Sequence, residues 1–225
     1  MQGISLRQIA LTGLAACAIL LTGCASAPKQ DLSAFRQAKP ASILVLPPLN
    51  ESPDVNATSS MLSQVTFPLA EAGYYVLPVS LVTETFRNNG MQMPGEMHQA
   101  PVQKLKEIFG ADAALYIKVT RYGNTYAILN SVAIVSAEAR LINLSNGQLL
   151  WEGKASASND SGNNNQGGGL AGLLVAAIVK QILHEAVDAS HPVAGMAAVQ
   201  LLSADGPNGM LYGPRSPMYG KETVK

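Results

Sequence analysis

The sequence predicts an α/β fold, a single two-layer domain in which helices pack on one mixed sheet. Two short, continuous apolar runs lie on either side of a helical pattern near the start, which predicts a βαβ unit. Residues alternating between apolar and polar follow from about residue 113 to 157 and predict an antiparallel meander. A largely apolar stretch of about twenty residues then begins at Leu170 and predicts a long C-terminal helix.

The first 23 residues have the composition of a secretory signal peptide. Arg7 supplies a weakly basic start, and the run Ile9–Leu21 is apolar apart from Thr12. This run is shorter than the roughly 20 residues that a helix needs to cross a bilayer. We therefore expect residues 1–23 to be removed rather than retained as an anchor.

The end of the signal resembles the bacterial lipobox, in which Leu and two small residues precede Cys. Here the motif reads Leu21-Thr22-Gly23-Cys24. The resemblance implies that the Cys24 sulfur is diacylglycerylated and that the signal is cut just before it, so Cys24 is the predicted lipidation site and membrane anchor. Similar lipoproteins with Asp after the cysteine tend to stay in the inner membrane. Ala25 and Ser26 follow here, which favours the outer membrane, facing the periplasm or the cell surface.

The composition of the mature chain excludes several classes of function. Without residues 1–23 the only cysteine is Cys24, so no disulfide can form within the chain and the fold depends on an apolar core. Fourteen basic residues remain against fifteen acidic ones, and no basic block occurs. Nucleic-acid binding and a polybasic membrane patch are both disfavoured. No pattern points to a cofactor.

Residues 24–40 are expected to form a lipidated, flexible tether, and residues 41–202 the domain. Its first strand is Ile43–Leu46, which Pro47 and Pro48 close. A helical pattern then runs to Gly73, with a kink or a new helical start expected at Pro68. A second strand at 74–77 should be parallel to the first.

The rest of the domain is expected to contain two more helices, a hairpin meander and a C-terminal helix. Helices are expected at 79–89 and 101–109, with a loop at 91–100, and three strands follow. Asn146-Gly147 predicts a type I′ hairpin turn in this meander. Trp151 is expected to cover the core edge. Residues 158–169 are expected to be a flexible loop, and the helix from Leu170 to continue after Pro192. Residues 203–225 are a C-terminal tail that drapes over the domain or is disordered.

Four phrases carry a family resemblance: "KPASILVLPPLNESPDVNA", "FPLAEAGYYVLPVSLVTETFRNNG", "IFGADAALYIKVTRYG" and "LINLSNGQLLWEG". They resemble the neisserial vaccine-candidate outer-membrane lipoprotein family, to which no function is assigned, over about residues 29–155. The resemblance implies a fold similar to the amino-terminal domain of the translocation protein TolB. Similar domains occur in lipoproteins that activate peptidoglycan synthases and in the curli secretion lipoprotein. It supplies no catalytic residues.

One string is typical of an enzyme. His184-Glu185 followed by Asp188 approximates the zinc-protease pattern, in which residues four apart share a helix face and the Glu serves as base. A third zinc ligand is not evident in the sequence, and a solvated polar helix face explains the string better. A metallopeptidase is therefore the alternative from another class, and no metal site is predicted.

The apolar helix offers a candidate oligomer interface. Gly168 and Gly172 have the spacing that permits close helix pairing. The candidate interface residues are Gly172, Leu174, Val175 and Ala176. Packing within the domain, burial in a second copy to give a homodimer, and membrane insertion all remain open.

Taken together, the sequence predicts an outer-membrane lipoprotein that acts without catalysis as an accessory or assembly factor for other envelope proteins. An activator of a peptidoglycan synthase is the alternative within this class. The identity of the partner does not follow from the residues.

Overall fold

A computed structural model describes residues 30–126, 131–159, 189–204, 206 and 208–221. Residues from Leu32 onward form one compact unit. The elements of its first half are α2 (Ser33–Ala38), β1 (Ser42–Val45), β2 (Leu49–Asn50), α3 (Ala57–Gln64), α4 (Thr66–Glu71) and β3 (Tyr75–Val76). Those of its second half are α5 (Val79–Asn88), α6 (Pro94–Met97), α7 (Val102–Phe109), β4 (Ala113–Tyr126), β5 (Ser131–Asn143), β6 (Leu149–Ser158) and α9 (Ser190–Leu202).

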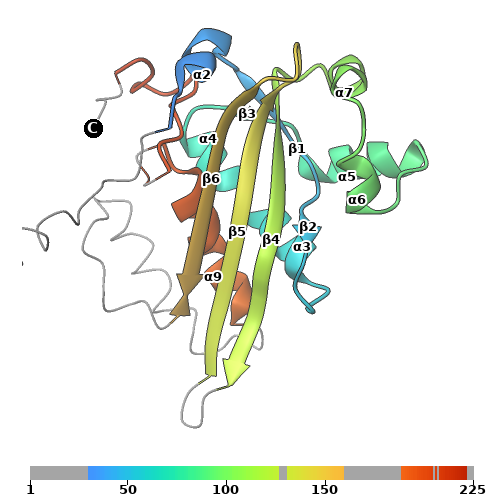
Figure 1. Cartoon of the computed structure of the whole chain (residues 1–225), viewed down its shortest axis with the longest axis vertical. Coiled ribbons are helices and arrows are strands. Elements are labelled where there is room, and N and C mark those ends of the chain that lie inside the picture. The colour runs from blue at the N-terminus through green and yellow to red at the C-terminus, as the bar shows by residue number, and fades with distance from the viewer. Residues whose placement is uncertain (1–29, 127–130, 160–188, 205, 207, 222–225) are drawn as a thin grey trace, which may run out of the picture. The chain divides into compact units, whose positions relative to one another are not determined.

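The sheet has the predicted mixed topology, with strand order β3-β1-β4-β5-β6 (Figure 1). β1 is parallel to β3, as the βαβ pattern predicts, and it is also parallel to β4. The two-residue strand β2 pairs with β4 further along, where Leu49 lies opposite Lys118. β4, β5 and β6 form the antiparallel meander. The predicted α/β fold with one mixed sheet is therefore confirmed.

Proline explains where the first helical region breaks. α3 ends at Gln64 and α4 begins at Thr66, so the helix starts again just before Pro68. A proline ring clashes with the carbonyl four residues earlier, which is that of Gln64. Within the first turn of the new helix the missing N–H costs no hydrogen bond. The expected new start is therefore present.

Two segments are more ordered than the sequence predicts. The range expected to be a tether contains α2, whose Phe35 is buried in the core, with Arg36 and Lys39 exposed beside it. Phe35 docks this short helix on the core, and Leu32, Ala34 and Ala38 pack beside it. The range expected to be a loop contains α6, where the Glu96 carboxylate accepts hydrogen bonds from the backbone of Gln92 and Met93.

The turn between β5 and β6 differs from the prediction. A type I′ turn needs positive φ at both central residues. Gly147 has φ 76°, but Asn146 does not share this conformation, because Lys39 is the only non-glycine residue with positive φ in the described ranges. The Gly147 N–H instead donates to the Asn143 carbonyl at 2.8 Å. The Asn143 side chain accepts from the N–H of Ser145, which favours this wider loop. The hairpin is present, and the type I′ assignment was wrong.

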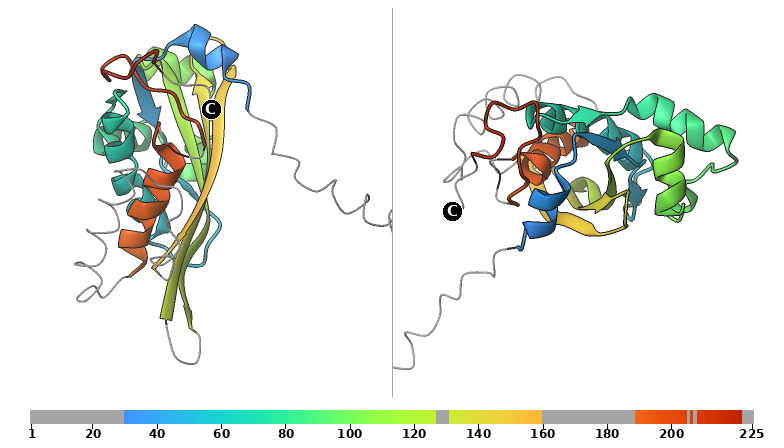
Figure 2. Two further views of the ribbon diagram at one scale, coloured as in Figure 1. Left: turned by 90° about the vertical axis from the view of Figure 1, so that its left-hand side faces the viewer. Right: turned by 90° about the horizontal axis from the view of Figure 1, so that it is seen from above.

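Two apolar clusters lie on opposite faces of β1, because successive side chains of a strand alternate. Ile43 and Val45 belong to the larger cluster, under α2, α3, α4 and α9, and Leu44 and Leu46 to the smaller one, with α5, α6 and α7. Figure 2 shows α3, α4 and α9 together on one side of the sheet. Helices therefore cover both faces near β1, while the meander is covered by helices on one face.

The C-terminal tail packs on the domain. The Trp151 indole N–H donates to the Asn208 carbonyl at 2.8 Å, and the Tyr74 hydroxyl donates to the Leu211 carbonyl at 2.6 Å. Trp151 is fully buried, which confirms its expected place at the core. Gly213 donates to the Ala72 carbonyl, and the tail passes so close that a Cβ on Gly213 would lie 2.5 Å from the Gly73 oxygen. The tail therefore drapes, and glycine is needed where it crosses.

α9 confirms the predicted continuation of helix after Pro192. Of the loop expected at 158–169, Ser158 belongs to β6, and residues 160–169 and the predicted helix start at Leu170 lie outside the described residues.

Candidate functional site

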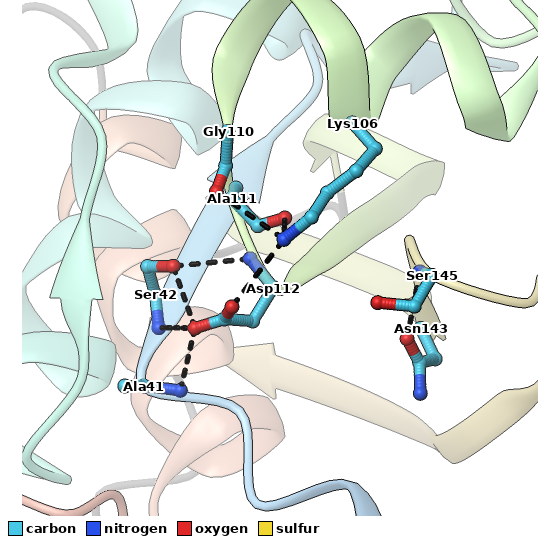
Figure 3. Close-up of polar contacts among 8 residues, drawn as sticks. All are labelled: Ala41, Ser42, Lys106, Gly110, Ala111, Asp112, Asn143 and Ser145. Atoms are coloured by element: carbon cyan, nitrogen blue, oxygen red, sulfur yellow. Dashed lines mark hydrogen bonds and ion pairs between the residues drawn. The ribbon is translucent and has the colours of Figure 1, made fainter.

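The densest polar cluster joins the starts of β1 and β4 (Figure 3). Asp112 directly precedes β4, and its Oδ2 accepts hydrogen bonds from the N–H groups of Ala41 and Ser42 at 3.0 and 3.1 Å. The same oxygen accepts the Ser42 hydroxyl at 2.9 Å, while the Asp112 N–H donates back to that Oγ at 3.0 Å. Parallel strands lack a tight turn to fix their register. The reciprocal hydrogen bonds between Ser42 and Asp112 fix the register of β1 against β4 instead.

Lys106 completes the cluster from the last turn of α7. Its Nζ donates to the Ala111 carbonyl at 2.9 Å and lies 3.5 Å from Asp112 Oδ1. Burial alone would raise the pKa of Asp112, but the Ser42 hydroxyl, the Ala41 and Ser42 amides and Lys106 together hold that pKa below its usual value. Asp112 therefore stays ionised and acts as a hydrogen-bond acceptor, which suits a structural role rather than that of a proton donor.

His98 has a similar structural role. Its Nε2 lies 2.9 Å from the Pro47 carbonyl, which can only accept, so this nitrogen carries the proton. The ring packs edge-on against Tyr116 with 5.3 Å between centroids. Burial lowers the pKa of His98, and the positive charge of Arg140 lowers it further. The hydrogen bond to the Pro47 carbonyl raises the pKa but does not cancel the effect of burial. His98 is therefore neutral at pH 7 and links the turn after β1 to the loop after α6.

A serine and a histidine meet between α3 and α9. Ser60 Oγ lies 2.8 Å from His191 Nδ1, and Gln64 Nε2 lies 2.9 Å from His191 Nε2. Both ring nitrogens of His191 are therefore engaged with side chains of α3. The contact ties the two helices together.

A shallow cleft lies beside a β-bulge in β4. The register of β4 against β5 shifts between Val119 and Arg121, and Thr120 donates to the Ser136 carbonyl. Bulges often occur next to functional sites because they re-aim side chains. The cleft has a volume of about 420 Å³. Its lining residues are Glu51, Ser52, Pro53, Asp54, Thr120, Arg121, Tyr122, Gly123, Asn124 and Ile134.

The meander face without helices carries paired charges. Glu138 of β5 lies between Lys118 of β4 and Lys154 of β6 in register, and the Lys154 Nζ is 2.8 Å from the Glu138 carboxylate. Lys118 also pairs with Glu51 at 3.2 Å. Such exposed pairs are typical of a solvated sheet face. This confirms the wet face that the alternating pattern predicts.

The predicted site residues lie elsewhere in the chain. Cys24, the candidate interface residues Gly172, Leu174, Val175 and Ala176, and the string His184-Glu185 fall outside the described residues, so these assignments stay predictions. In the described part of the chain, no three His, Cys, Asp or Glu side chains are grouped to hold a metal ion. No helix in the same ranges is long and apolar enough to cross a membrane.

Sequence reasoning did not find the Asp112 cluster or the Ser60–His191 contact. The position of Asp112 could have suggested it, since this residue stands between the helix-ending Gly110 and a buried strand. Ser60 and His191 are 131 residues apart and only the tertiary fold brings them together.

Comparison with known proteins identifies relatives over most of the chain. The family model "Putative lipoprotein GNA1162-like" matches residues 30–215. A relative from Neisseria meningitidis serogroup B, "Putative lipoprotein NMB1124/NMB1162", is 48% identical over 215 residues, which are 96% of this chain and 97% of the relative. The names of the family and this relative describe lipoproteins and no enzymatic activity.

A solved structure of a relative agrees on the fold. The crystal structure of lipoprotein GNA1162 from Neisseria meningitidis is 55% identical, with a TM-score of 0.53 over 65% of this chain and all of that one. The C-terminal domain of LpoB from Salmonella enterica is 17% identical, with a TM-score of 0.39 over 56% of this chain and 90% of that one, too distant to indicate function. The extent of the family match and the 48% identity show that the chain belongs to the GNA1162-like lipoprotein family.

Proposed function

We propose that this protein is an outer-membrane lipoprotein that works without catalysis, by holding its α/β domain at the membrane and docking to other envelope proteins. One observation carries the non-enzymatic part. Among the described residues, Asp112, His98 and the Ser60–His191 pair each use their hydrogen bonds to join two segments of the chain. Their chemistry stabilises the domain.

The anchor rests on the motif Leu21-Thr22-Gly23-Cys24 together with family membership. An acyl chain contributes about 0.8 kcal/mol for each buried CH₂, and two or more chains give stable membrane binding. Ala25 and Ser26 in place of Asp support the outer membrane as the destination. Cys24→Ala should abolish acyl labelling and leave uncleaved precursor, and wild-type labelling of that variant would contradict the anchor.

Docking is tested by crosslinking in intact cells. A photoreactive amino acid is placed at exposed positions on separate surfaces, for example Arg121 at the cleft and Glu84 on α5. At least one position should give a discrete crosslinked product with another envelope protein, and mass spectrometry identifies it. Failure to capture any protein from all exposed positions would contradict the docking role. A peptidoglycan synthase among the products would favour the activator alternative.

The metallopeptidase alternative requires zinc at His184-Glu185. We expect purified full-length protein to contain no stoichiometric zinc. Stoichiometric zinc that His184→Ala removes would replace the docking proposal with an enzymatic one.

The candidate interface is tested separately. Light scattering across a concentration series should show a dimer of the full chain in detergent that Leu174→Glu or Val175→Glu shifts towards monomer. A monomer at every concentration would contradict the homodimer.

A further inference from the structure

We propose that the end of the domain formed by α2 and the C-terminal tail is a surface that rests on an anionic phospholipid membrane. We call this surface the tail end. The inference builds on the proposed function, because it needs the anchor at Cys24. The residues of the tail end belong to α2 and the position just after it (Arg36, Lys39), to β3 (Tyr75) and to the C-terminal tail (Arg215, Met218, Tyr219, Lys221).

The covalent link to the anchor supplies the first argument. Cys24 lies only nine residues before the first residue of α2, Ser33. A fully extended chain of that length reaches about 30 Å, at about 3.3–3.6 Å per residue. Figures 1 and 2 show α2 and the tail at the same end of the domain, opposite the end where β4 finishes and β5 begins. The tether therefore attaches at the tail end and keeps it close to the bilayer.

The exposed apolar side chains of the tail end supply the second argument. Tyr75, Met218 and Tyr219 are 48%, 44% and 39% exposed. Arg215 lies over the Tyr75 ring, 5.2 Å from its centroid, and its N–H donates to the Gly73 carbonyl. These contacts join the tail to β3. Tyrosine rings with an apolar body and a polar tip are enriched at the membrane–water interface.

Backbone hydrogen bonds hold the end of the tail in a compact turn. The Tyr219 N–H donates to the Ser216 carbonyl, and the Lys221 N–H donates to the Met218 carbonyl. Met218 and Tyr219 are thereby kept within one turn of Arg215. The backbone of this segment is thus already ordered before it meets a surface.

Charge supplies the third argument. Arg36, Lys39, Arg215 and Lys221 are all exposed. The exposed acidic residues near them are Glu71 at the end of α4, Asp31 before α2, and Glu152 of β6, the strand that α2 contacts; Glu222 lies outside the described residues. Basic side chains near anionic lipid are attracted to its surface potential. Because these four come from sequence positions up to 185 residues apart, no basic block reveals them in the sequence.

Fluorescence quenching tests which end touches lipid. Full-length lipidated protein is reconstituted in vesicles of phosphatidylethanolamine and phosphatidylglycerol, with or without brominated acyl chains. Tyr219→Trp reports on the tail end. Val55→Trp is the matched control, since Val55 is 87% exposed in the loop between β2 and α3. The fully buried Trp151 contributes the same background to both.

We expect brominated lipid to reduce the added emission of Tyr219→Trp and to leave that of Val55→Trp unchanged. Adding Lys221→Glu to Tyr219→Trp should reduce the quenching, and adding Arg121→Glu at the cleft should not. High salt should act like Lys221→Glu, because it screens exposed charges.

The outcomes separate the two proposals. If the protein floats with the vesicles but both reporters are quenched equally, or only Val55→Trp is quenched, the tail-end assignment is wrong and the anchor stands. The same conclusion follows if neither reporter is quenched. If the wild-type protein does not float with the vesicles, the anchor is wrong and the tail-end assignment falls with it.

Discussion

The two faces of the meander are made by the same strands yet differ in almost every property. On the face under α9, β5 presents small buried side chains such as Ala133, Ala137 and Ala139. On the opposite face the intervening residues include Glu138 and Arg140. Small residues let a helix approach the sheet closely, and charged residues keep the other face in water. The comparison indicates that stability depends on the helix-covered face, while the wet face is free to vary.

The difference extends to the helices. α9 meets the sheet through its own small residues, including Ala194, Ala197 and Ala198, all fully buried. The cluster under α5, α6 and α7 uses larger side chains such as Phe86, and the Phe86 and Phe109 rings lie 5.2 Å apart. A close-packed interface of small residues has little room for added atoms. The helix-covered face of the meander is therefore expected to tolerate substitution least.

The largest expected effect is that of a charge on this face. Ala137→Glu places a carboxylate in the core opposite Val119, where the described residues supply no cation. We expect a loss of more than about 4 kcal/mol in the free energy of unfolding, or failure to fold, because an unpaired buried charge is costly. Denaturant unfolding followed by circular dichroism measures it. Ala137→Ser is the control, and near-wild-type stability of Ala137→Glu would remove the contrast between the faces.

Removing the largest buried ring should have the next largest effect. Trp151→Ala leaves a cavity and breaks the bond to the Asn208 carbonyl, so we expect a loss of about 3–5 kcal/mol. The tail should also loosen, which hydrogen exchange at Gly209 and Gly213 would report, because the N–H groups of these residues donate to the carbonyls of Gly206 and Ala72. Trp151→Phe keeps most of the apolar contact and should cost less. Unchanged protection of the tail in Trp151→Ala would show that the tail is held without this ring.

A substitution in the turn between β5 and β6 should have a smaller effect, because it changes the link between two strands and neither face of the sheet. Gly147→Val forces a β-branched residue to φ 76°, and we expect a loss of more than about 1 kcal/mol from backbone strain. Nothing lies within 4 Å of a Cβ built on Gly147, so crowding does not contribute. Gly147→Asn, which tolerates this conformation, should lose less. Equal unfolding midpoints for the Val and Asn variants would exclude strain as the cause.

Much of this contrast could be predicted from the sequence. Alternation across β4 and β5 indicated which residues are buried, and the βαβ pattern indicated the parallel pairing of β1 and β3. Both follow from local periodicity, which the backbone imposes directly. Asn146-Gly147 predicted the hairpin but not its turn type, because the Asn143 side-chain acceptor favoured a wider loop.

Features that depend on distant residues could not be predicted. α2 docks mainly through the buried Phe35, with Ala34 and Ala38 partly buried beside it, and these few apolar residues form no helical period in a polar segment. The Asp112 cluster joins residues 70 apart, and the tail end gathers basic residues from both ends of the chain. Neither has a local period, so no pattern in a short window predicts it.

The smallest expected effect lies on the wet face, one residue from the largest. Glu138→Ala removes the pairing with Lys154, and both side chains are in water, so we expect an unchanged melting temperature at pH 7 in physiological salt. The hydrogen bond from Lys154 lowers the pKa of Glu138 below its usual value. A carboxylate with a lowered folded-state pKa stabilises the protein above its unfolded pKa, and this contribution disappears as pH falls through the folded pKa. Any small advantage of wild type over Glu138→Ala, measured at low salt, should therefore be present at neutral pH and vanish in acid. An advantage that grows in acid, or a drop in melting temperature comparable to that of Trp151→Ala, would mean that the wet face contributes to stability as much as the helix-covered one.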